Sequence, residues 1–213
     1  MKTDDLIKAL AADAQSVEPP IARTLAVAVG AGALLSLIGF MLTIGPRPDF
    51  FELLSTSVRY TFKLIVMLSL AIPAFFLVRG LSRPDFKPDG SLWWLAFAPA
   101  LLLLGIGLEL AAMPSDTWHA RMIGHNSFYC MTIIPILSLA PFIAVLYALK
   151  SGAPTYPTIA GAVGGVLSAG IGATLYASHC PDDSPLFVAL WYPVGFVLMT
   201  VLGALIGSRF LRW

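Results

Sequence analysis

The sequence predicts an all-α integral membrane protein with six transmembrane helices and with both termini in the cytoplasm. Two observations predict the transmembrane helices. Hydrophobic residues make up 58% and charged residues 12% of the 213 residues, whereas a soluble domain has about 45–50% and about 25%. The hydrophobic residues also form six continuous blocks, each close to the roughly 20 residues that a helix needs to cross a bilayer. The strands of a transmembrane β-barrel alternate between apolar and polar residues. Because the blocks show no such alternation, the sequence excludes a β-barrel.

The predicted spans occupy most of the chain, at residues 24–44, 60–78, 91–112, 127–149, 154–177 and 186–207. They form one transmembrane domain, 23–213, after an N-terminal tail, 1–22. Acidic residues precede the first block, which is therefore a retained helix and not a cleaved signal. Since the spans and short loops leave no room for a separate catalytic domain, we do not expect an enzyme.

The distribution of Lys and Arg predicts the orientation. One side of the predicted helices carries nine of the 13, and the other carries three, which are Arg47, Arg59 and Arg121, with Lys63 just inside the second span on that side. The basic side of a membrane protein faces the cytoplasm. We therefore expect both termini in the cytoplasm and the protein in the bacterial inner membrane, embedded in its lipid bilayer.

The tail is predicted to form a short amphipathic helix. Asp4 and Asp5 complement the positive N-terminus of a helix, and Leu6, Ile7 and Leu10 share one face. A helix this short is marginal in water unless a partner covers its apolar face. The alternative is that it lies on the membrane surface.

Small residues recur at every fourth position of the fifth predicted span. They are Gly161, Gly165, Ala169, Ala173 and Ala177. Such a stripe allows a neighbouring backbone to approach closely, so it predicts a helix-packing seam and not a binding site.

Every cysteine and histidine is predicted on the outward side. Cys130 begins the fourth span, Cys180 lies between the fifth and sixth, and His119, His125 and His179 lie in the same outward loops. Three interpretations remain open: a structural disulfide, a thiol pair that responds to oxidation or to a soft metal with help from the histidines, and catalytic thiols. The spacing matches no compact metal motif, so we expect no resident cofactor, only transient metal binding.

The rival classes of function are a small transporter, a thiol oxidoreductase and a structural membrane subunit. No Asp, Glu or His lies near the middle of a predicted span, where a proton or ion pathway would need one. The chain has no Cys-x-x-Cys and only two cysteines, whereas a thiol relay normally uses a second pair.

Lys63 and Glu109 lie at similar predicted depth near the outer interface, so we expect a structural ion pair between them.

Several segments carry a resemblance to a known family: the opening MKTDDLIKALAAD, the RYTFK that starts the second span, and Cys180 followed by Asp-x-Ser-Pro and a Trp-Tyr pair. Together with the six spans and the outward Cys130, they make the chain resemble, over essentially its full length, the NrsF-type negative regulators of extracytoplasmic-function sigma factors.

The resemblance implies an anti-sigma factor that does not itself bind nucleic acid. Its cytoplasmic tail would hold the sigma factor at the membrane, and a periplasmic stress read by Cys130 and Cys180 would release it. By position, the sigma-contacting residues would be Asp4, Asp5, Leu6, Ile7, Leu10 and Ala11. The apolar face of the tail is compatible with this role, because short helices of this kind bind in grooves.

Overall fold

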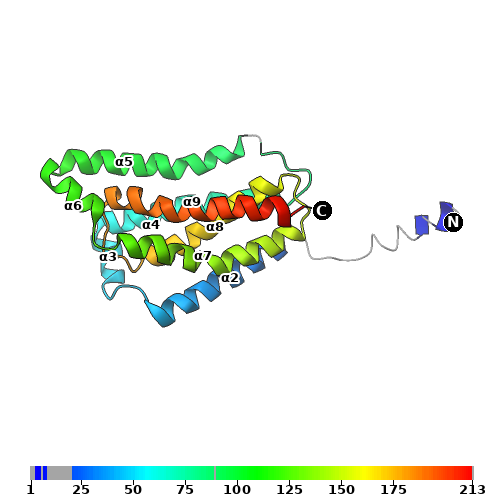
Figure 1. The fold of residues 1–213 in the computed structure, drawn as a ribbon, viewed down its shortest axis with the longest axis horizontal. Helices are drawn as coiled ribbons and strands as arrows, with labels where there is room; N and C mark the ends of the chain where they lie inside the picture. The colour runs from blue at the N-terminus through cyan, green and yellow to red at the C-terminus, as the bar shows by residue number, and fades with distance from the viewer. Residues whose placement is uncertain (1–2, 6, 9–20, 89, 213) are drawn as a thin grey trace.

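The computed structural model describes residues 3–5, 7–8, 21–88 and 90–212, which contain helices and no strand. Residues 3–5 and 7–8 are helical. The later elements, shown in Figure 1, are α2 (Ile21–Thr43), α3 (Phe50–Thr56), α4 (Val58–Leu81), the 3-10 helix η1 (Ser91–Ala96), α5 (Phe97–Ala112), η2 (Ser115–Thr117), α6 (Trp118–Ile123), α7 (Ser127–Lys150), α8 (Pro157–Ala177) and α9 (Pro185–Phe210).

Six helical stretches of the described chain are long and apolar enough to cross a membrane, with η1 and α5 forming one of them. The prediction of an all-α fold with six spans is confirmed. Three helices extend beyond the predicted limits, since α2 begins at Ile21, α4 ends at Leu81 and α9 ends at Phe210, whereas α8 begins later than predicted, at Pro157. The short helices α3 and α6 were not predicted, because a helix of one or two turns gives no measurable periodicity.

Helix α8 is the centre of the bundle, and α4, α7 and α9 pack around it (Figure 1). Over its most apolar window, 61% of α8 is buried in the protein, whereas the corresponding figure for the span Ser91–Ala112 is 17%. Helix α5 therefore lies at the edge of the bundle, with most of its surface directed to lipid.

The predicted seam on α8 is confirmed by its packing against α9. Gly161 lies against the backbone of Gly203, and Gly165 lies against the backbone at Met199. A Cβ atom at either glycine would collide with main-chain atoms of α9, which have no freedom to move aside. The small residues thus allow the two backbones to touch, which replaces side-chain burial as the source of packing energy in lipid.

Successive spans run in opposite directions, so each end of the bundle collects its own set of loops (Figure 1). At the end where α2 begins, Gly152 packs on Ser82 and the Thr155 hydroxyl donates a 2.7 Å hydrogen bond to the Pro84 carbonyl. The α2–α3 and α8–α9 loops meet at the opposite end. This second end holds the candidate site.

Candidate functional site

The two thiols lie together at the second end of the bundle. Cys130 is in the first turn of α7, and Cys180 is in the loop between α8 and α9. Both are free thiols with 0% exposure, and both side chains belong to one buried cluster. The fold thus brings together in one buried cluster two cysteines that are distant in the sequence.

Aromatic side chains enclose the thiols. The Tyr176 and Tyr192 rings have centroids 6.1 Å apart, and Phe187 packs edge-on to Tyr192 at 6.5 Å. Within the described chain, neither tyrosine hydroxyl has a hydrogen-bond partner, although both are buried. An unpaired buried hydroxyl costs about 1–3 kcal/mol, and both tyrosines belong to the same buried cluster as Cys130 and Cys180.

The surroundings of Cys180 favour its ionised form and lower the pKa of its thiol to about 7. The largest cause is the hydrogen bond from Cys130, burial acts in the opposite direction, and the positive charge of Lys63 adds to the lowering. Since the thiolate is the form that attacks oxidants and binds metals, Cys180 is placed to react as the nucleophile.

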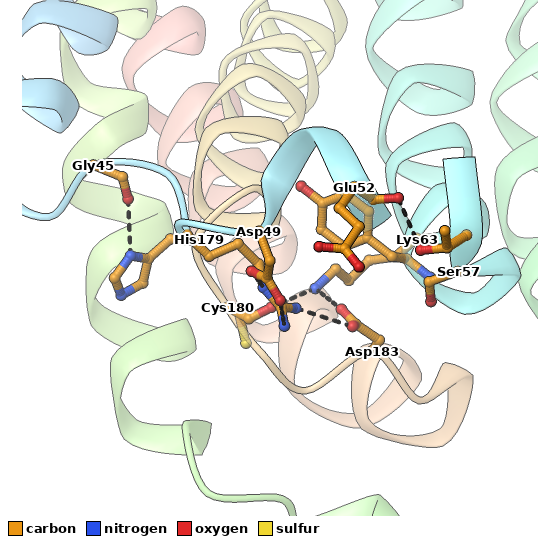
Figure 2. Close-up of polar contacts among 11 residues, drawn as sticks. Gly45, Asp49, Glu52, Ser57, Lys63, His179, Cys180 and Asp183 are labelled. Atoms are coloured by element: carbon orange, nitrogen blue, oxygen red, sulfur yellow. Dashed lines mark hydrogen bonds and ion pairs between the residues drawn. The ribbon is translucent and has the colours of Figure 1, made fainter. Parts of the chain in front are cut away.

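Lys63 of α4 points into this site and not toward Glu109, so the predicted ion pair was wrong. The Lys63 ammonium pairs with Asp183, while Glu109 pairs with Arg121 at 3.2 Å and Arg59 at 3.6 Å. The physical reason is that the α8–α9 loop supplies a nearer carboxylate than α5 does. Figure 2 shows the ammonium between Asp183 and the Cys180 main chain.

Asp183 also binds the loop that follows α2. It accepts a 3.1 Å hydrogen bond from Arg47, which is paired at 2.7 Å with Asp49 as well. The hydrogen bond from Arg47 lowers the pKa of Asp49. The Arg47 amide donates to the Ser178 carbonyl at 3.1 Å. The α2–α3 loop is therefore fixed to the loop that carries Cys180 through both side chains and backbone.

Asp182 fixes the same loop to the start of α7. One of its oxygens accepts from the backbone amides of His125 at 3.1 Å and Asn126 at 3.0 Å, and from the Asn126 side chain at 2.9 Å. These amides precede the first turn of α7, where helical amides lack partners of their own. The carboxylate therefore links the Cys180 loop to the helix that carries Cys130.

The histidines do not join the cysteines. The His179 ring bonds to the Gly45 carbonyl at 2.8 Å and points toward it in Figure 2, and His125 has 94% of its side chain exposed. His119 is also exposed. Among the residues that the structure describes, no three His, Cys, Asp or Glu side chains gather to hold a metal. In the described residues Cys130 and Cys180 therefore form a two-sulfur site, and the help of the histidines in transient metal binding stays a prediction.

The predicted partner-binding segment is described only in part. Asp4, Asp5 and Ile7 are helical and exposed, with Ile7 58% exposed. Leu6, Leu10 and Ala11 lie outside the described residues.

Comparison with known proteins decides the family. The family described as "NrsF: Negative regulator of sigma F" matches residues 10–213. The chain belongs to the NrsF family. No solved structure matches it.

Two curated NrsF proteins match the whole chain over their own whole length. The chain is 34% identical over 217 residues to the anti-sigma-F factor NrsF of Caulobacter vibrioides. It is 33% identical over 227 residues to the probable anti-sigma-F factor NrsF of Azospira oryzae. NrsF proteins are negative regulators of a sigma factor, so this membrane protein is a regulator and not an enzyme.

Sequence reasoning missed the two aspartates that organise the NrsF site. Asp182 and Asp183 directly follow the Cys-Pro pair, and that adjacency was the available signal. A buried cation such as Lys63 needs an anion close by, and Asp182 and Asp183 are the acidic residues nearest in sequence to an outward cysteine. The sequence pattern did not indicate the path of the loop between α8 and α9, which decides where the two carboxylates lie.

Proposed function

We propose that this NrsF protein sequesters an extracytoplasmic-function sigma factor through its N-terminal cytoplasmic segment and releases it when Cys130 and Cys180 respond to periplasmic redox or metal stress. The observation that carries the proposal is the pair of free thiols, buried against each other at the end of the bundle opposite the start of α2.

The orientation supports this arrangement. Nine Lys and Arg residues belong to the side that carries the tail, and four, Lys63 among them, belong to the side that carries the thiols. The positive side faces the cytoplasm, where a sigma factor acts, and the thiols then face the periplasm across the inner membrane. The exposed Asp4, Asp5 and Ile7 belong to the binding segment, which Leu6, Leu10 and Ala11 complete, and they suit helix-in-groove recognition.

The chemistry of release follows from two neighbouring sulfurs. With a peroxide as the oxidant, the thiols lose two protons and two electrons, a sulfur–sulfur bond forms, and the peroxide is reduced to water. A soft metal ion would instead displace the two thiol protons and bind both sulfurs. Since both thiols have 0% exposure, either agent must be small or must await local opening of the loop.

Either event must favour a second arrangement of the bundle. A tenfold change in sigma-factor retention needs about 1.4 kcal/mol of differential stabilisation, and a nearly complete switch needs about 5.5 kcal/mol. The loop that carries Cys180 contacts α4, α7 and the α2–α3 loop through Lys63, Asn126 and Arg47. A change at the sulfurs therefore acts on several helices at once.

The test is co-purification from native membranes in mild detergent, with the intact protein beside a variant that lacks residues 1–20. We expect a sigma factor with the intact protein and none with the truncated one. In cells, the Cys130→Ser, Cys180→Ser double variant should retain the sigma factor under stress. Absence of a sigma factor from the intact protein would reject sequestration and favour a transporter or a thiol oxidoreductase, whereas normal release from the double variant would reject only the thiol assignment.

A further inference from the structure

Lys63 is enclosed at the base of the thiol site. Its side chain is 1% exposed, and its ammonium donates to the Cys180 carbonyl at 2.7 Å and to Asp183. The ammonium also lies 5.4 Å from the centre of the Tyr60 ring. The gap beside Lys63 and Asp183 admits no water molecule. Because a buried charge must be satisfied by what surrounds it, these protein groups alone hold the cation.

The bond to Cys180 is to its main chain, and this determines what Lys63 does. The Cys180 amide donates to the Tyr176 carbonyl at 3.0 Å, and the Cys180 carbonyl accepts from Lys63. Both peptide groups next to the Cys180 side chain are therefore held, one by α8 and the other by α4. A backbone held on both sides fixes the direction of the Cα–Cβ bond of Cys180, and the χ1 rotamer that remains is limited by the packing of the buried cluster that Cys180 shares with Cys130.

We propose that Lys63 is a positioning residue for the thiol pair, holding the Cys180 backbone so that one bifunctional ligand binds both sulfurs at once. This proposal rests on the proposed function, since it concerns the same thiols. Asp183 in turn holds Lys63, and Arg47 holds Asp183 from the other side. Loss of Lys63 lets Cys180 turn away from Cys130 while both thiols stay chemically intact.

The probe is phenylarsine oxide, a trivalent arsenical that bridges two close thiols. Two arsenic–sulfur bonds form, the arsenic–oxygen bond breaks, and the oxygen leaves as water with the two thiol protons, so the reaction needs no oxidant. Capture is measured on the full chain in lipid nanodiscs by intact mass spectrometry, in competition with a small dithiol. N-ethylmaleimide, which reacts with one thiol at a time, is measured in parallel as the reference for accessibility.

The informative variant is Lys63→Met with Asp183→Leu. It removes both charges, so no unpaired ion is left in the core, and apolar replacement of a buried pair is often neutral for stability. Its folding is checked by thermal unfolding. The matched control is Arg47→Met, which removes the other cation bound to Asp183 and leaves the bond from Lys63 to the Cys180 carbonyl in place.

We expect the parent and Arg47→Met to bridge the arsenical, and the double variant to bridge it about tenfold more weakly, because the second thiol no longer binds at high effective concentration. Reaction with N-ethylmaleimide should not fall in the double variant. Bridging equal to that of the parent would overturn the positioning role. Failure of the parent itself to bridge would instead reject the thiol pair of the proposed function, so the two failures are distinguishable.

Discussion

The hydroxyl of Ser184 donates a 2.8 Å hydrogen bond to Glu109 and so connects the loop that carries Cys180 to α5. The same oxygen accepts from the Leu186 amide at 3.2 Å, as the N-cap of α9. The three residues Asp182, Asp183 and Ser184 thus bind three different partners. They bind the start of α7, the buried Lys63 and the outer end of α5.

The double role of Ser184 predicts the effect of its removal. In Ser184→Ala, α9 loses its cap and Glu109 loses a neutral donor, so we expect the free energy of unfolding to fall by about 1–2 kcal/mol. Thermal unfolding in detergent measures the change. Ser184→Thr retains the hydroxyl and is the control. Equal stability of the Ala variant and the parent would show that water replaces both bonds.

The contacts of Asp182 predict that loss of its carboxylate destabilises the start of α7 locally. Asp182→Ala leaves the amides of His125 and Asn126 without their acceptor, and the loss of several bonds to one carboxylate should cost about 1–3 kcal/mol. We expect faster hydrogen exchange at these two amides, with little change in α8. Asp116→Ala, an exposed acidic residue in the same outward region, is the control. Unchanged hydrogen exchange at the Asn126 amide would show that Asp182 does not hold the start of α7.

The two candidate partners of Lys63, Glu109 and Asp183, show which features of the site could be predicted from the sequence. The continuous apolar runs specified the spans, because lipid requires every backbone group to be paired within a helix. The depth of Lys63 correctly required a counter-charge. Choosing between two carboxylates needs the path of a loop of a few residues, and that path depends on Asp182, Asn126 and Arg47 acting together. No periodicity encodes such a loop.

The α8–α9 seam predicts a large effect of added volume. Gly165→Leu places a side chain where the backbone of α9 at Met199 now lies, and overpacking of this kind costs about 1–3 kcal/mol or more. We expect a lower unfolding temperature and partial separation of the two helices. Gly39→Ala is the matched control, since its Cβ position is open and Ala favours a helix. A tolerated Leu at position 165 would mean that α9 is free to move away.

The pH dependence of thiol alkylation tests the environment of Cys180. Its thiol pKa is lowered to about 7, so the thiolate is present above that pH and is lost as the pH falls through it. Alkylation by iodoacetamide, followed at Cys180 by peptide mass spectrometry, should rise through pH 7 and then level off. Cys130→Ala removes the hydrogen bond that lowers the pKa most, so its profile should move to higher pH. A parent profile that keeps rising to about pH 8.5, as for an ordinary cysteine, would show that burial outweighs both the Cys130 bond and the Lys63 charge.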